Sequence, residues 1–147
     1  MYPHFFRLGG KYRRSFVPSL VQTDGSFYSG KRSGFVAALL HHNDNIYKQT
    51  VWLETAEDSC ETEWASVYNG IIFSLNKQAT QIHIENDNLG VVESLIATTI
   101  SPKQKKRREK EYATYYRHAI LSLVKQTNYA AIRWIPREQN RADDLFR

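Results

Sequence analysis

Four acidic positions in this 147-residue chain have the residue type and the placement that metal chemistry requires. They are Asp24, Glu63, Asp87 and one member of the neighbouring pair Asp143 and Asp144. Carboxylate oxygens are the ligands that hard cations such as Mg²⁺ prefer. Four carboxylates packed together without a cation would repel one another. If folding gathers these side chains, the chemistry that they favour is the binding of divalent cations.

Each acid also has an ordinary structural interpretation. Asp24 precedes Gly25 and would serve as a turn residue. Asp87 would cap a helix that begins near residue 88, and Glu63 would complement the dipole of a helix in whose first turn it lies. Taken singly, each structural interpretation is at least as good as a catalytic one. The combination of four acids, in this order and on these elements, favours chemistry.

The elements that must position the acids can be predicted from the hydrophobic pattern. Residues 20–28, 34–42 and 46–53 predict three antiparallel strands, with polar turns at 29–32 and 43–45. The apolar period then changes to that of a helix from residue 64 to residue 75, and Asp58 with Glu61 resembles a capping box at its start. Residues 81–85 predict a fourth strand, followed by a short helix that ends before Pro102.

The remaining residues predict a longer helix from about 105 to 126 and a fifth strand over 129–135. The order β-β-β-α-β-α-α-β is typical of the α/β class, with one mixed sheet and helices on both faces. Of the three tryptophans, Trp52 and Trp134 lie in predicted strands and Trp64 on the buried helix stripe. We therefore expect all three to be mainly core residues.

The composition is that of a single folded domain. Hydrophobic residues make up 41% of the chain and aromatic residues 13%, well away from the signature of disorder. A lone cysteine, Cys60, cannot form an internal disulfide, and no apolar run approaches the roughly 20 residues of a membrane span. The first 19 residues lack the apolar stretch of a secretory signal. An intracellular protein with no membrane partner is expected.

Positive charge is clustered in two places. The first 23 residues contain four cations and no acid, and residues 103–110 contain six cations and only one acid, Glu109. Clustered positive charge is typical of proteins that bind polyanions. A solvated helix face is an equally good interpretation of one basic run.

Several segments together resemble the type 1 ribonuclease H family, which includes related domains of reverse transcriptases and mobile elements. The matching segments are TDGS at 23–26, ETEWA at 61–65, ENDN at 85–88, WIPREQN at 134–140 and ADDL at 142–145. Bacterial members carry a mobile histidine before the last acid. Here Arg137 and Glu138 occupy that loop, as in the archaeal and plant-like branch. The resemblance spans residues 20–147 and leaves 1–19 as a basic N-terminal extension.

The resemblance implies a ribonuclease H-like fold with a five-stranded sheet of order 3-2-1-4-5 and the acids on one side. It also implies two Mg²⁺ or Mn²⁺ ions, with Asp24 bridging both, Glu63 and Asp87 favouring one, and the last Asp favouring the other. Two cations about 3.5–4 Å apart can clamp both the attacking and the leaving oxygen of a phosphodiester. The implied activity is hydrolysis of the RNA strand of an RNA–DNA hybrid, leaving 5′-phosphate and 3′-hydroxyl ends, by a protein expected to be a monomer.

Substrate contacts are implied by the same resemblance. Residues 103–110 fall where some members carry a basic protrusion, and Ser59 and Cys60 stand where many members have two asparagines. The expected contacts are Gly25, Ser26, Ser59, Cys60, Asn88, Lys105, Lys106, Arg107, Arg108, Arg137 and Asn140.

The identity of the fourth acid is ambiguous. The family's Ala-Asp-x-Leu ending selects Asp143, whereas the usual spacing from Asn140 selects Asp144. We favour Asp143, because neighbours on a helix point about 100° apart and Leu145 must face the sheet. Two other functions stay open at this point, namely a catalytically silent nucleic-acid-binding module and a related DNA nuclease of the resolvase or transposase type.

Overall fold

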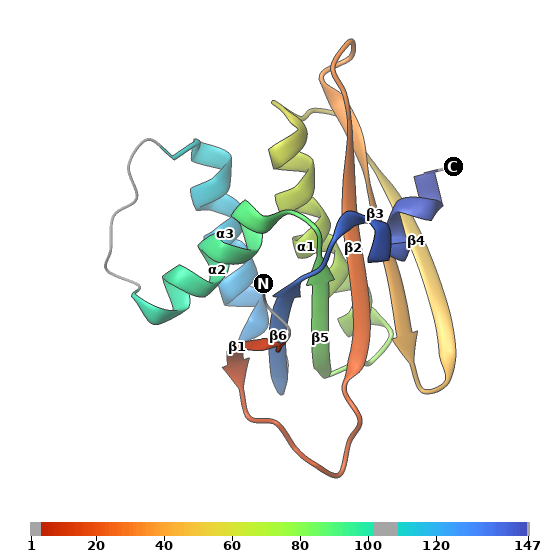
Figure 1. Ribbon diagram of the computed structural model, residues 1–147, viewed down its shortest axis with the longest axis vertical. Coiled ribbons are helices and arrows are strands. Elements are labelled where there is room, and N and C mark those ends of the chain that lie inside the picture. The colour runs from red at the N-terminus through yellow and green to blue at the C-terminus, as the bar shows by residue number, and fades with distance from the viewer. Residues whose placement is uncertain (1–3, 102–108, 147) are drawn as a thin grey trace.

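The structure is a computed structural model that describes residues 4–101 and 109–146. Within these ranges, six strands form one mixed sheet in the order β1-β6-β5-β2-β3-β4 (Figure 1). The strands are β1 (Phe6–Gly10), β2 (Ser19–Tyr28), β3 (Ser33–His42), β4 (Asn45–Leu53), β5 (Gln81–Asn86) and β6 (Tyr129–Trp134). The helices are α1 (Ser59–Asn76), α2 (Leu89–Ile100) and α3 (Glu111–Val124), with two short 3-10 helices, η1 (Arg137–Gln139) and η2 (Arg141–Phe146).

The predicted fold class and the order of the five predicted strands are confirmed. The predicted order 3-2-1-4-5 corresponds to β4-β3-β2-β5-β6, in which β2 pairs antiparallel with β3 and parallel with β5. The predicted number of strands was wrong by one. Residues 6–10, which we expected in an N-terminal extension, form β1 and pair antiparallel with β6. Two adjacent glycines, Gly9 and Gly10, and a register shift between Arg7 and Gly9 hide the period of two that identifies a strand.

The two faces of the sheet are covered differently. Buried side chains of α1, α2 and α3 pack with those of the central strands in one apolar cluster. On the opposite face, which we call the η2 face, Ala142, Leu145 and Phe146 pack against Ala37 and Leu39 of β3. Because strand side chains alternate, even-numbered residues of β2 and odd-numbered residues of β3 point to the η2 face.

The start of α1 follows from local chemistry. Asp58 is the N-cap, and its carboxylate accepts from the Glu61 backbone N–H at 3.0 Å. Glu61 reaches back to the backbone N–H of Glu57 at 2.8 Å, one residue earlier than in a standard capping box. Further along α1, a Cβ added to Gly70 would lie 2.4 Å from the Thr23 methyl group. The absence of a side chain at residue 70 therefore lets α1 pack closely on β2.

Two details of the predicted elements were wrong. α3 begins at Glu111 and ends at Val124, and residues 105–108 of the predicted helix lie outside the described ranges. Trp64 is 3% exposed, as expected of a core residue, but Trp52 is 42% exposed. β4 is an edge strand, and the η2 face is open at this end of it.

No helix in the part of the chain that the structure describes is long and apolar enough to cross a membrane.

Candidate metal centre

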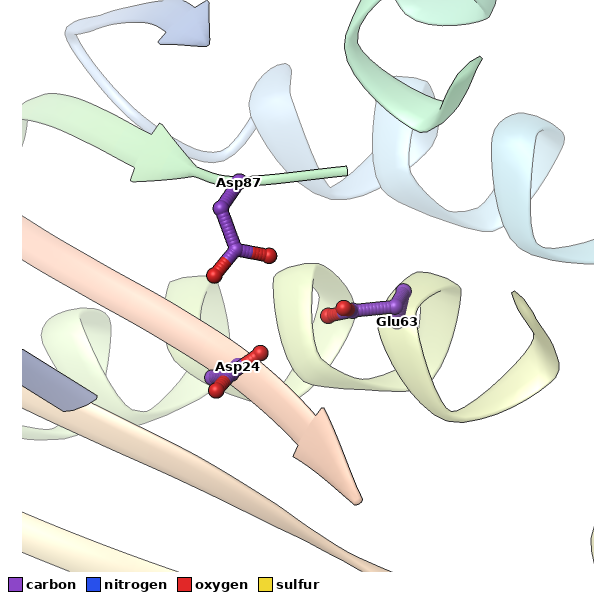
Figure 2. A group of neighbouring side chains, drawn as sticks. All are labelled: Asp24, Glu63 and Asp87. Carbon is purple, nitrogen blue, oxygen red and sulfur yellow. The ribbon is translucent and has the colours of Figure 1, made fainter. Parts of the chain in front are cut away.

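Three of the predicted acids meet near the carboxyl ends of the central parallel strands β2 and β5. Asp24 lies in β2, Glu63 lies in the first turns of α1, and Asp87 follows β5 directly. Each offers one carboxylate oxygen, and these three oxygens lie within 4.8 Å of one another (Figure 2). β2 and β5 run parallel, so the chain leaves both in the same direction, and α1 packs across β2. We call Asp24, Glu63 and Asp87 the acid cluster.

Gly25 joins two members of the acid cluster through its backbone. Its N–H donates to Asp24 Oδ1 and to Glu63 Oε1, both at 3.0 Å. A Cβ at this position would lie 2.5 Å from the backbone carbonyl of Thr62. A residue with a side chain would therefore force α1 away from β2 and separate Glu63 from Asp24. Gly25 was predicted as a substrate contact, and in the structure its N–H orients the carboxylates.

The two terminal aspartates differ in their surroundings. Asp143 is half-buried and close enough to Asp24 to act on it through its charge and a side-chain hydrogen bond. Asp144 is exposed and forms an ion pair with Arg141 at 3.8 Å. η2 thus directs the first aspartate toward the acid cluster and the second toward solvent.

The charged forms of the clustered acids are disfavoured in the metal-free protein. Burial and the nearby carboxylates of Asp87 and Asp143 raise the pKa of Asp24 to about 7. Burial, Asp24 and Asp87 raise the pKa of Glu63 to about 9. Burial also raises the pKa of Asp87, although hydrogen bonding from Asn140 and the charge of Arg137 partly oppose it. These are hard oxygen donors whose mutual repulsion the charge of Arg137 offsets only in part, and the residues present therefore fit a divalent cation.

Two buried asparagines fix the loops around the acid cluster. Asn86 donates to the carbonyl and hydroxyl oxygens of Thr23 at 3.1 and 3.0 Å and accepts from the Asn88 N–H at 2.8 Å. Asn140 donates to the Thr23 carbonyl at 2.9 Å and to Asp87 at 3.3 Å. Asn140 was predicted as a substrate contact, but it is 3% exposed and its amide is engaged within the protein.

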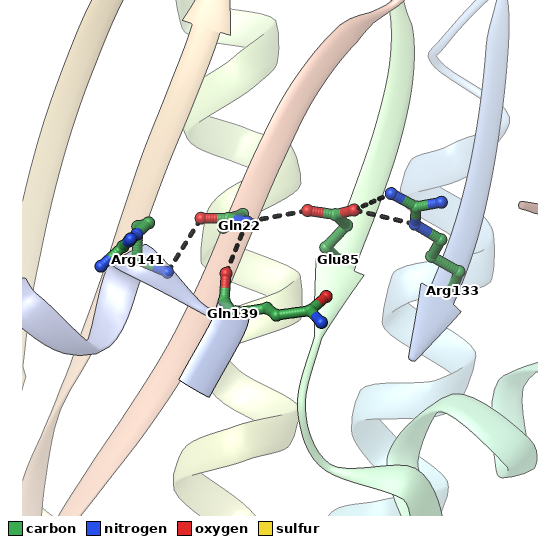
Figure 3. Close-up of polar contacts among 5 residues, drawn as sticks. All are labelled: Gln22, Glu85, Arg133, Gln139 and Arg141. Carbon is green, nitrogen blue, oxygen red and sulfur yellow. Dashed lines mark hydrogen bonds and ion pairs between the residues drawn. The ribbon is translucent and has the colours of Figure 1, made fainter. Parts of the chain in front are cut away.

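A chain of polar contacts on the η2 face ties η1 and η2 to the sheet (Figure 3). Gln22 Nε2 donates to Glu85 at 2.8 Å and to the Gln139 carbonyl at 3.3 Å, and Gln22 Oε1 accepts from the Arg141 N–H at 3.0 Å. Arg133 Nε donates to the other oxygen of Glu85 at 2.8 Å. We call these contacts the Gln22 network. This network was not predicted, although polar residues inside strands, such as Gln22 and Glu85, were the available signal.

The other predicted contact residues have different environments in the structure. Ser26 is half-buried on β2, Ser59 is exposed at the start of α1, and Arg137 is exposed in η1. Cys60 packs against the apolar cluster. Asn88 caps α2 by accepting from the Val91 N–H at 3.0 Å. Residues 105–108 lie outside the described ranges.

The sheet order and the clustered acids together define a ribonuclease H-like domain. A sequence profile of the reverse transcriptase-like family matches residues 22–146, and the chain belongs to this family of ribonuclease H proteins. A search of curated proteins finds no significant match.

Solved structures of ribonucleases H share the fold. The N-terminal ribonuclease H domain of a Mycobacterium tuberculosis protein is 19% identical, with a TM-score of 0.72 over 88% of this chain and 91% of that one. Ribonuclease H1 from the halophilic archaeon Halobacterium salinarum is 16% identical, with a TM-score of 0.68 over 88% and 94% of the two chains. LC11 ribonuclease H1, solved in complex with an RNA/DNA hybrid, is 12% identical, with a TM-score of 0.69 over 86% and 92%.

Proposed function

We propose that this protein is an endonuclease that hydrolyses the RNA strand of RNA–DNA hybrids with two divalent cations, Mg²⁺ or Mn²⁺. The observation that carries the proposal is the meeting of Asp24, Glu63 and Asp87, with carboxylate oxygens within 4.8 Å of one another. Membership of the reverse transcriptase-like family and the shared fold support it. The complex of LC11 ribonuclease H1 with an RNA/DNA hybrid supports the choice of substrate.

In this proposal Asp24, Glu63, Asp87 and Asp143 hold the cations. Asp24 would contribute to holding both cations, because it lies near Asp87 and Asp143, whose charges raise the pKa of its carboxyl group. The exposure of Asp144 and its ion pair with Arg141 favour Asp143 as the fourth ligand. When bound, two such cations supply Lewis-acid stabilisation of the attacking and leaving oxygens, with 5′-phosphate and 3′-hydroxyl products.

The chain's own groups prepare the carboxylates for this task. The Gly25 N–H holds Asp24 and Glu63 in one orientation, and Asn140 holds Asp87. Because burial raises the pKa values of Asp24 and Glu63, cation binding must displace protons from their carboxyl oxygens. Cation affinity therefore increases with pH.

Substrate contacts are proposed on the surface around the acid cluster. The Ser59 hydroxyl and the Arg137 guanidinium are exposed there, and residues 105–108 would contact phosphates without reading sequence. Discrimination for RNA would come from contacts to 2′-hydroxyls in the wide minor groove. A catalytic domain over residues 20–147, a monomeric state and an intracellular location stay predictions.

One assay tests the proposal. The protein is incubated with end-labelled RNA–DNA hybrid, double-stranded RNA and double-stranded DNA, each with Mg²⁺, Mn²⁺ or EDTA. Cleavage confined to the hybrid and abolished by EDTA is expected. Hybrid binding without cleavage under every metal condition would instead identify a silent binding module, and cleavage of duplex DNA would identify a DNA nuclease.

A further inference from the structure

Three aromatic side chains gather beside the β2–β3 turn, where β2 and β4 end and β3 begins. We call Tyr28, Phe35 and Trp52 the aromatic platform. The ring centroids of Phe35 and Trp52 are 4.7 Å apart, and the Tyr28 centroid lies 5.9 Å from that of Phe35 and 6.2 Å from that of Trp52. Tyr28 is 46% exposed and Trp52 is 42% exposed. The rings line an open hollow of about 540 Å³ that Lys31 borders.

The aromatic platform lies on the same face of the sheet as Asp24. In the register of β2 and β3, Asp24 pairs with Ala37 and Ser26 pairs with Phe35, and Phe35 pairs in turn with Trp52. Directly paired residues point to the same face, so Phe35 and Trp52 lie in the row after that of Asp24, and Tyr28, which pairs with Ser33, lies one row further. Adjacent rows are separated by about 6–7 Å along the strands. A nucleic-acid strand held at Asp24 would therefore have its flanking nucleotides over these rings.

The platform is also bordered by positive charge. Lys31 and Arg32 are exposed in the β2–β3 turn, residues 26–35 include no acid, and neither cation forms a salt bridge with any residue that the structure describes. Mutual packing of the rings explains why they lie together, but it leaves two of them almost half exposed. Exposed aromatic faces beside free cations are typical of surfaces that stack bases and contact phosphates.

We propose that the aromatic platform binds an unpaired nucleotide of the substrate, at the point where a hybrid passes into single-stranded RNA. An unpaired base can turn a free face toward Trp52 or Tyr28, whereas bases inside a duplex are covered by their neighbours on both faces. Lys31 and Arg32 contact the phosphates on either side of this nucleotide. The proposal rests on the proposed function and adds a preference for hybrids with single-stranded extensions.

Binding without cleavage tests the preference directly. The full chain in EDTA is titrated against a fluorescein-labelled blunt hybrid and against the same hybrid with a short single-stranded RNA extension, with fluorescence anisotropy as the readout. The extended hybrid should bind about tenfold more tightly, since one stacked base contributes at about this level. Trp52→Ala should reduce its affinity to that of the blunt hybrid. Trp52→Phe, which keeps an aromatic ring, should retain the preference.

A matched control is Tyr115→Ala, which removes an exposed aromatic side chain from α3, outside the platform. It should change neither affinity. Tyr28→Ala is a second test of the platform if Trp52→Ala fails to unfold cooperatively in a urea titration. Equal affinities for blunt and extended hybrids, or a Trp52→Ala protein that keeps the preference, would overturn the inference and assign the platform to a protein partner or to simple packing. Cleavage of the hybrid without such a preference would leave the proposed function intact, whereas a chain that binds no hybrid would contradict both.

Discussion

Among single residues, Asp24 lies close to the carboxylates of Glu63, Asp87 and Asp143. Glu63 shares its Gly25 hydrogen-bond donor, and the charges of Asp87 and Asp143 raise its pKa. Asp24→Asn should remove nearly all hybrid cleavage, because the shared cation ligand is lost. In EDTA the same variant should be at least as resistant to urea as the wild type, because repulsion within the acid cluster decreases. Cleavage above about a tenth of the wild-type rate would contradict the assigned role, since loss of the cation clamp should change the barrier by several kcal/mol.

The neighbouring pair Asp143 and Asp144 offers a matched comparison. Asp143 is half-buried, and its charge raises the pKa of Asp24, whereas Asp144 forms an ion pair with Arg141 at the surface. Asp143→Asn should reduce kcat by orders of magnitude and raise the Mg²⁺ concentration needed for half-maximal rate. Asp144→Asn should alter kcat less than about twofold and stability by no more than about 1 kcal/mol, as expected for an exposed ion pair. Reversed severities would show that Asp144 is the ligand and that η2 rotates when cations bind.

At the scale of elements, local signals determined what could be predicted. The Asp58 cap, the apolar stripe of α1 and the turns around β3 depend on residues close in sequence, and all of them are present in the structure. β1 could not be predicted in this way, because the groups that pack against its two glycines belong to α3, to Asn128 and to β6, more than a hundred residues away. The exposure of Trp52 was missed for the same reason, because it depends on which strand forms the edge of the sheet.

The acids could be predicted from the sequence, whereas the groups that hold them in place could not. Carboxylates at the ends of predicted elements could be chosen by type and order, with the family resemblance to link them. The roles of Gln22, Asn86 and Asn140 could not, because each depends on bonds that join strands and loops distant in sequence. Asn140 shows the consequence. Its place in a family motif indicated a substrate contact, which stays a prediction, and its burial and its bond to Asp87 give it a supporting place that the motif did not indicate.

The Gln22 network makes a prediction at this scale. Gln22→Met keeps the approximate side-chain volume but removes the bonds to Glu85, Gln139 and Arg141. The segment that carries Asp143 should then be less firmly placed, so kcat should fall and the Mg²⁺ requirement should rise, with little change in KM. Stability should decrease by about 1–3 kcal/mol, because buried polar groups lose partners.

The control for this network is Gln139→Ala. Gln139 accepts from Gln22 through its backbone carbonyl, and that bond survives the loss of the side chain (Figure 3). Its kinetics and urea midpoint should match those of the wild type. If Gln22→Met lowers stability but leaves kcat and the Mg²⁺ requirement unchanged, the network stabilises the fold without positioning Asp143.

At the scale of the whole molecule, the net charge of +5 should matter for binding more than for chemistry. Replacing Lys105, Lys106, Arg107 and Arg108 with alanine should raise KM and leave kcat nearly unchanged, because remote phosphate contacts are alike in the ground and transition states. The plot of log affinity against log salt concentration should also become shallower, since fewer counterions are released. An unchanged slope would show that this run is only a solvated surface.

The acid cluster also makes the stability of the whole molecule depend on pH and metal. The folded-state pKa values of Asp24 and Glu63, about 7 and about 9, lie above their ordinary values of 3.8 and 4.5. Between those limits each of the two carboxyl groups binds more protons in the folded protein than in the unfolded chain. Their contribution to metal-free stability is therefore full at low pH and is lost as pH rises through about 7 for Asp24 and about 9 for Glu63. His83 acts in the opposite direction, because burial and Arg133 lower its pKa.

The free energy of unfolding in EDTA, measured by urea titration, should therefore decrease from about pH 5 to about pH 9 in the wild type and decrease less in an Asp24→Asn, Glu63→Gln double variant. Mg²⁺ binds only the ionised carboxylates, so the rise in Tm that it produces should be small at pH 5 and large at pH 9. Equal Mg²⁺ effects at both values of pH, or identical pH profiles for the wild type and the double variant, would show that these carboxylates are not where the cations bind.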